Sequence, residues 1–125
     1  MSVTSVKALH GQVPENGMAM GSVDWGGMSV ISHRWPAGLD VTPVLQAAVG
    51  DLLCQVPHYF YCISGAFTIR YTDNGSEEGV KAGDVAYARP GHTLAASEDS
   101  EVLEISSADL NHFLMARIQA TGLLG

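Results

Sequence analysis

Two histidines stand in segments whose backbone is restrained by their neighbours. His58 follows proline in the run Cys-Gln-Val-Pro-His, and His92 follows the turn sequence Arg-Pro-Gly. Proline fixes its own φ and glycine tolerates positive φ, so both side chains should be held at defined positions. Imidazole is a common metal ligand and a general acid or base near neutral pH. Either residue could instead be a structural histidine bonded to a backbone carbonyl. Two histidines framed in this way favour a functional role.

Cys54 lies four residues before His58 and could supply a third metal ligand. A thiolate combined with imidazoles suits zinc or iron. Free cysteine is also common as an inert core residue, and both interpretations of Cys54 stay open. Cys62 is predicted to be a core residue. If the intervening segment is an extended strand, the two thiols are too far apart to form a disulfide.

Among the acidic residues, Glu104 is the best candidate for a catalytic role, because it lies between two apolar residues of a predicted strand. Solvent is the ordinary place for such a side chain, but an inward Glu104 would be a ready general base. His33 is expected at the surface or in a supporting position beside the site. The remaining histidines, His10 and His112, receive no role.

These residues must be positioned by a chain of short strands separated by Gly-rich turns. Strands are predicted at residues 28–35, 58–63, 67–72, 78–81, 85–88, 93–97 and 102–105. The Asp-Asn-Gly sequence at residues 73–75 predicts a tight hairpin. Residues 42–45 could form another short strand or a turn. Residues 1–24 resemble an arm with one short strand, held by Val3 and Val6. This pattern indicates an all-β sandwich or barrel.

The C-terminal part differs, because its apolar residues recur at helical spacing. A helix is predicted over residues 106–120, begun by a capping box and packed on the barrel. The capping residues are Ser106 and Asp109, and the apolar face is Leu110, Phe113, Leu114 and Ile118.

Over residues 35–106 the chain resembles the cupin superfamily, whose two motifs combine spaced glycines with histidine and glutamate ligands. Gly65 fits the closing glycine of the first motif, and Gly83 and Gly91 fit the second. The resemblance implies a cupin-like jelly-roll β-barrel with a short C-terminal α-helix. It also implies a divalent metal, a small-molecule substrate and a homodimer.

The ligand positions of the two motifs depart from the family pattern. In the first motif His58 occupies the glutamate position, and Cys54 occupies the position of the second histidine. In the second motif the histidine position holds Leu94, and His92 precedes it by two residues. By resemblance, Cys54, His58 and His92 are therefore the expected metal ligands through chemical substitution.

The length and charge of the chain limit the number of domains and the classes of partner. The chain has 125 residues, which suits one domain (1–125), and a net charge of −7 from 13 acidic and 6 basic residues. Such a chain without a basic cluster is a poor partner for nucleic acid or an anionic membrane. Without an apolar run long enough to span a bilayer or a leader sequence, a cytoplasmic location is expected.

The sequence thus predicts a small enzyme of the cupin type that uses zinc, iron, nickel or manganese. It would act as an isomerase, cyclase, dehydratase or dioxygenase on a small organic molecule. Its expected catalytic residues are His58, His92 and Glu104. Two alternatives remain: a metal-free ligand-binding or sensor module, and a metal-free acid–base enzyme using histidine and Glu104.

Overall fold

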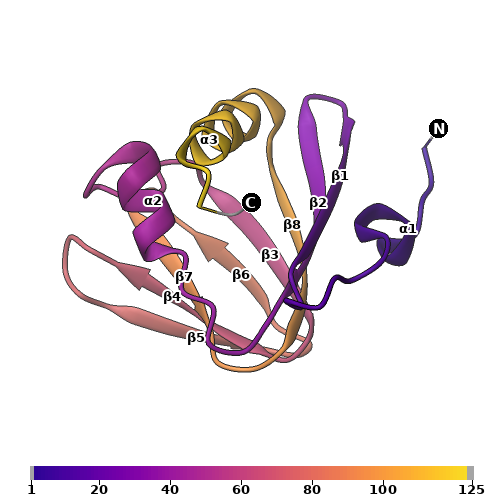
Figure 1. Cartoon of the computed structure of the whole chain (residues 1–125), viewed down its shortest axis with the longest axis horizontal. Coiled ribbons are helices and arrows are strands. Elements are labelled where there is room, and N and C mark those ends of the chain that lie inside the picture. The colour runs from indigo at the N-terminus through magenta and orange to yellow at the C-terminus, as the bar shows by residue number, and fades with distance from the viewer. Residues whose placement is uncertain (1, 124–125) are drawn as a thin grey trace.

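The computed structural model describes residues 2–123 and contains eight strands and three helices in that part of the chain. Figure 1 shows their arrangement. In chain order the elements are α1 (Val6–His10), β1 (Ala19–Trp25), β2 (Met28–Trp35), α2 (Thr42–Val49), β3 (His58–Ser64), β4 (Ala66–Tyr71), β5 (Glu77–Lys81), β6 (Val85–Ala88), β7 (His92–Ala96), β8 (Ser100–Ser107) and α3 (Ala108–Thr121).

The strands form two antiparallel sheets that face each other. One sheet has the order β1-β2-β8-β3-β6, and the other has the order β5-β4-β7. Consecutive strands such as β3 and β4 belong to different sheets, so the chain repeatedly crosses between them. In the described part, no helix is long and apolar enough to cross a membrane.

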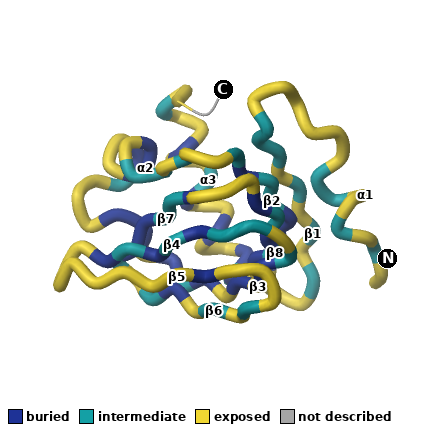
Figure 2. Tube along the Cα trace, turned by 90° about the horizontal axis from the view of Figure 1, so that it is seen from below, coloured by how far each residue is buried: buried dark blue, intermediate teal, exposed yellow. Residues whose placement is uncertain are grey.

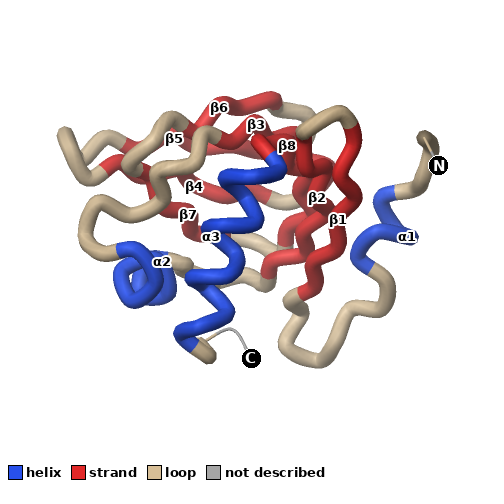
Figure 3. The backbone as a smooth tube through the Cα atoms, turned by 90° about the horizontal axis from the view of Figure 1, so that it is seen from above, coloured by secondary structure: helices blue, strands red, loops and turns tan. Residues whose placement is uncertain are grey.

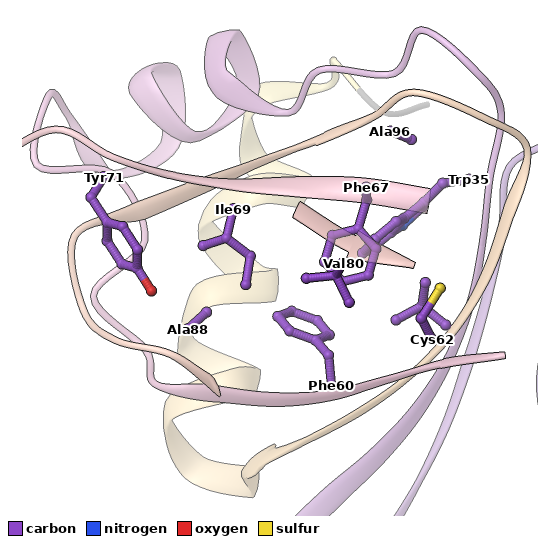
Figure 4. Packing of buried hydrophobic residues seen from close by; sticks show 10 residues of the cluster. Trp35, Phe60, Cys62, Phe67, Ile69, Tyr71, Val80, Ala88 and Ala96 are labelled. Atoms are coloured by element: carbon purple, nitrogen blue, oxygen red, sulfur yellow. The ribbon is translucent and has the colours of Figure 1, made fainter. Parts of the chain in front are cut away.

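Alternation along the strands builds the core between the sheets. In β3, Phe60 and Cys62 are buried while Tyr59 and Tyr61 point outward. Figure 4 shows Phe60 and Phe67 among the other side chains of this core. The two rings meet edge to face at 5.4 Å between centroids, a geometry that aromatic pairs prefer. Cys62 is therefore a core residue, as predicted, and both cysteines are free thiols.

A second apolar cluster joins the inner faces of two helices to the segment before β3. Helices α2 and α3 pack against each other on one side of the sheets, while α1 lies outside β1 (Figures 1 and 3). Burial is concentrated in the strands and on the inner faces of α2 and α3 (Figure 2). The cluster consists of Val44, Leu45, Ala48, Leu53, Cys54, Val56, Leu114 and Ile118.

Several expectations about the N-terminal half are wrong in detail. Residues 42–49 form helix α2, because Pro43 favours the first helical turn and apolar residues follow at helical spacing. The one short strand expected in the arm is confirmed as β1, which ends one residue beyond the arm, but helix α1 was not expected. Val3 is 80% exposed, so it cannot hold this segment in place.

The C-terminal helix begins one residue later than the predicted capping box. Ser107 is its N-cap and accepts a hydrogen bond from the Leu110 N–H, while Ser106 belongs to β8. The buried face also differs from the predicted one. Leu110 and Phe113 are exposed, and the buried residues of α3 are Ala108, Asn111, Leu114 and Ile118.

Candidate metal centre and adjoining cavity

Backbone pairing brings the segment before β3 against the start of β7. Cys54 and His92 form an isolated antiparallel bridge, with the Cys54 N–H donating to the His92 carbonyl at 3.0 Å. Gly91 precedes His92 with φ of 92° and donates its N–H to the Cys54 carbonyl at 2.7 Å. Glycine suits this position because other residues rarely adopt such a φ. The Arg-Pro-Gly turn therefore places His92 directly opposite Cys54.

Three of the predicted site residues meet at this bridge. The Cys54 Sγ atom lies 3.3 Å from His58 Nε2, and the His58 and His92 rings are 5.2 Å apart between centroids. One ligand atom from each of the three residues lies within 4.8 Å of the others. All three side chains are nearly inaccessible, with exposures of 2%, 4% and 1%. The structure thus brings Cys54, His58 and His92 into one buried group.

In each of the two imidazoles, the Nδ1 atom already has a hydrogen-bond acceptor beside it. His92 Nδ1 lies 2.7 Å from the Arg89 carbonyl, which can only accept, so Nδ1 carries the proton. His58 Nδ1 lies 2.8 Å from Glu104 Oε2, as an ion pair whose N–H is not aligned for a hydrogen bond. Both arrangements leave Nε2 for a metal, and outer acceptors of this kind orient metal-bound histidines. The donor set therefore fits a divalent metal.

The turn that holds His92 is itself anchored. The Arg89 guanidinium makes two contacts with the Asp73 carboxylate, at 3.0 and 3.1 Å. It also lies over the Tyr71 ring, 3.9 Å from the ring centroid. The Arg89 backbone N–H donates to the Tyr71 hydroxyl at 3.3 Å. These contacts fix the carbonyl that orients the His92 ring.

Charges in the group depend strongly on one another. Burial alone would raise the pKa of Cys54, but hydrogen bonds and charges from His58 and His92 outweigh it and lower the pKa to about 6. Burial alone would lower the pKa of His58, but the Glu104 charge and the Cys54 contact raise it to about 10. Without metal, the pair is therefore a thiolate beside an imidazolium near neutral pH.

Glu104 points inward and links the group to a further histidine. Its Oε1 accepts from His33 Nε2 at 2.8 Å, and its Oε2 accepts from the Ser106 hydroxyl at 3.1 Å. Burial would raise the pKa of Glu104, but His58 and His33 hold it well below its usual range. The ordinary expectation of a solvent-facing Glu104 is therefore wrong, because its side chain is only 7% exposed.

A cavity of about 350 Å³ adjoins this network, in the range of roughly 300–1,000 Å³ typical of small-molecule sites. His33, His58 and Glu104 line it, whereas Cys54 and His92 do not. The remaining lining residues come from the segment around residue 16, β1, β2, the start of α2, β7 and α3. Most are apolar: Met18, Ala19, Met20, Ile31, Trp35, Val41, Leu94, Leu114, Met115 and Ile118.

His33 was expected at the surface or in a supporting position beside the site, and the second alternative is confirmed, because His33 binds Glu104 and also lines the cavity. A signal was available, because residues 31 and 33 share one face of the same predicted strand. Asn111 was missed because it interrupts an apolar helical pattern. His10 and His112 lie outside the group and contact Ser32 and Asp24.

Comparison with solved structures identifies the architecture. An uncharacterised Klebsiella pneumoniae protein with a double-stranded β-helix domain superposes with a TM-score of 0.59 and 19% identity, covering 86% of this chain and 90% of that one. An RmlC-like cupin from Desulfovibrio desulfuricans gives a TM-score of 0.53 at 16% identity, covering 77% and 87%. This chain has the cupin fold.

Ectoine synthase from P. lautus shares this cupin fold with a TM-score of 0.60 and 14% identity, covering 86% of this chain and 78% of that one. No protein-family description and no curated protein matches the amino-acid sequence. At these identities the likeness of cupins to this chain concerns the fold, and any function has to come from the site.

Proposed function

We propose that this cupin is an enzyme that holds a divalent metal through Cys54, His58 and His92 and acts on a small organic molecule in the adjoining cavity. One observation carries the proposal. Two buried imidazoles have acceptors beside their Nδ1 atoms, and one ligand atom of each ring and the Cys54 sulfur lie within 4.8 Å of one another. Burying three such groups together without a common partner would be costly.

Zinc and iron suit the mixed thiolate and imidazole donors best, and nickel or manganese are the further candidates. When bound, a metal with three protein ligands supplies Lewis acidity at an open coordination position. Near neutral pH the Cys54 thiol is already ionised, so metal binding would release the proton held on His58 Nε2. Metal affinity should therefore rise with pH around neutrality.

The chain's own residues would orient the substrate and move protons. Glu104 holds the His58 ring through Nδ1 and also bonds His33, which lines the cavity. His58, His92 and Glu104 are the proposed catalytic residues, with His58 and Glu104 at the cavity wall. The apolar lining would exclude water from the reacting groups. Isomerisation, cyclisation and dehydration all fit such a site, as does oxygen insertion with iron.

A second function is favoured by a specific feature of the cavity. Cys54 and His92 do not line it, whereas His58, Glu104 and His33 do. A substrate would therefore meet the histidine–carboxylate network before the thiol. A metal-free acid–base enzyme using His58 and Glu104 fits this arrangement. Activity that survives removal of metal would establish this second function.

Metal analysis of the purified protein tests the proposal. The wild type should carry close to one equivalent of zinc, iron, nickel or manganese, and His58→Ala should lose most of it. Cys54→Ser should also lose metal, because a hydroxyl is a poor ligand for a soft site. His112→Ala is the matched control, because His112 lies at the surface beside Asp24 and should leave metal content unchanged.

Incubation with a small-metabolite mixture then tests catalysis. Metal-loaded wild type should consume a component that protein stripped by chelation does not. A wild type that purifies empty and takes up none of the four metals would contradict the metal enzyme. Retained compounds without turnover would instead indicate a ligand-binding or sensor module.

We also propose a homodimer formed through the outer face of β3, β6 and β8. Large apolar side chains on this face are 38–80% exposed, and soluble monomers rarely expose such patches. They are Tyr59, Tyr61, Val85, Tyr87 and Ile105. Sedimentation should show a dimer for the wild type and a monomer for Tyr87→Lys. A wild-type monomer at micromolar concentration would contradict this arrangement.

A cytoplasmic location completes the proposal. Cys54 and Cys62 are both free, and free thiol pairs are typical of reducing compartments. Fractionation of cells that express the protein should find it with the soluble reduced pool. Recovery from an oxidising compartment would contradict the location.

A further inference from the structure

Asn111 presents a buried amide to the cavity. It lies on the inner face of α3 with 5% exposure, next to Leu114 and Ile118 of the same face. It lines the cavity together with those two residues. Among residues 2–123 its side chain has no hydrogen-bond partner, although most buried side-chain polar groups have one.

The Asn111 amide is a polar group on a mostly apolar wall, and its unpartnered atoms reach the cavity, because they are not among the fully buried side-chain atoms that lack a partner. A leucine of similar volume would pack with the apolar neighbours of Asn111. Residues that break a packing rule in this way are concentrated at functional sites. A ligand that accepts from the Asn111 amide or donates to its carbonyl would pair with it.

His33 offers a second open hydrogen-bonding position on the cavity wall. Its Nε2 faces the Glu104 carboxylate at 2.8 Å, so Nε2 must be the donor. In the neutral ring Nδ1 is then an acceptor, and no described residue donates to it. A ligand hydroxyl or amine can donate to this atom.

The side chains that line the cavity favour a neutral ligand. Among the described residues that line it there is no lysine or arginine, and Glu104 contributes a carboxylate. Carboxylate and phosphate groups are usually bound by arginine, lysine or a helix N-terminus. An anionic ligand would therefore find neither arginine nor lysine in this cavity.

We propose that Asn111 and His33 recognise a neutral, largely apolar molecule that carries a carbonyl and a hydroxyl group. The Asn111 amide donates to the carbonyl oxygen, and the hydroxyl donates to His33 Nδ1. The apolar body of the ligand packs against Trp35 and the methionines of the wall. This specificity rests on the proposed small-molecule function of the cavity, but not on the metal.

Matched probes with one apolar body test this recognition by titration calorimetry. Phenacyl alcohol carries both groups, phenylacetate is its anionic counterpart, and ethylbenzene lacks both. Wild-type protein should bind phenacyl alcohol at least tenfold more tightly than the other two. Asn111→Leu should abolish that preference, while its melting temperature stays level or rises. Gln46→Leu is the control and should keep the preference, because Gln46 is an exposed amide on α2 outside the cavity.

A second variant keeps the test independent of how Asn111→Leu folds. His33→Gln retains an amide that can donate to Glu104 but has no acceptor at the Nδ1 position. It should weaken the binding of phenacyl alcohol at least tenfold. The binding of the methyl ether of phenacyl alcohol, which has no hydroxyl, should be unchanged.

Three results would overturn the proposal: equal binding of phenylacetate, an Asn111→Leu variant that keeps the preference with lowered stability, or no binding of phenacyl alcohol by the wild type. The metal content of the same preparations separates this failure from that of the proposed function. Asn111 is not among the metal-ligating candidates, so Asn111→Leu should retain full metal content.

Discussion

Replacing Glu104 by glutamine should destabilise the metal-free protein, because it removes the negative charge beside His58 and keeps the side-chain shape. In the fold the pKa of His58 rises from 6.5 to about 10, although burial opposes the rise. At about 1.4 kcal/mol per pKa unit, this corresponds to roughly 5 kcal/mol in favour of the protonated ring. Cys54 supplies part of that, so we expect Glu104→Gln to cost about 3 kcal/mol, in line with other broken buried pairs.

The loss should depend on pH in a defined direction. His58 has a raised pKa in the fold, so its contribution is complete below pH 6.5 and is lost as pH rises through about 10. Glu104 has a lowered pKa, so its contribution is present above 4.5 and is lost as pH falls below that value. The difference between wild type and Glu104→Gln should therefore be largest between about pH 5 and 6.5 and shrink by pH 10.

Urea unfolding after dialysis against a chelator measures the loss in free energy of unfolding. In thermal unfolding at pH 6, the same loss should lower the melting temperature by roughly 10 °C. Glu101→Gln is the matched control on the same strand, because its partner Arg34 is 39% exposed and such pairs contribute about 0–1 kcal/mol. Equal losses for the two variants at pH 6, or a Glu104→Gln loss that does not shrink at pH 10, would refute the reasoning.

Two further predictions concern the thiol and a crowded glycine. In metal-free protein the Cys54 thiolate absorbance should appear with a midpoint of about pH 6, because histidine hydrogen bonds stabilise it, and stability from this group should be lost as pH falls through that value. Cys54→Ser should remove this transition and leave Cys62, whose pKa is raised by burial; a single transition near pH 9 in the wild type would contradict the prediction. Gly65→Ala should lower the free energy of unfolding by at least about 2 kcal/mol, because the φ of Gly65 is 83° and an added Cβ would lie 2.3 Å from the Asp99 carbonyl oxygen. Gly75→Ala, with φ of 68° and open surroundings, should cost only about 1 kcal/mol in urea unfolding, and equal losses would count against the steric argument.

The strands were predictable because their signals are local. Alternation of apolar and polar residues, broken by glycine turns, predicts 28–35 and 85–88 with the bounds that the structure gives to β2 and β6. Helix α2 was not predicted, because Pro43 both breaks strands and begins helices, and residues 42–45 alone are compatible with either. Short segments of this kind are decided by tertiary packing, here against α3.

The candidate site was only half predictable for a similar reason. His58 and His92 stand out because local turns frame them, but the register between distant strands decides what faces them. The pairing of Phe60 with Glu104 across β3 and β8 turns the carboxylate inward, and nothing near Glu104 in the sequence specifies that pairing. The same holds for Asn111, whose burial depends on the rotation of α3 about its axis.

The bridge between Cys54 and His92 has a consequence for folding as well as for chemistry. His58 begins β3 in the five-stranded sheet, and His92 begins β7 in the three-stranded sheet. A metal held by both histidines would tie the two sheets together at one end, as a cross-link that only the folded chain can form. At a metal concentration one hundred times the dissociation constant, such linkage adds about 2.7 kcal/mol to stability. The stability of the folded chain would then depend on the metal concentration around it. A shortage of metal would lower both the stability of the fold and the proposed activity.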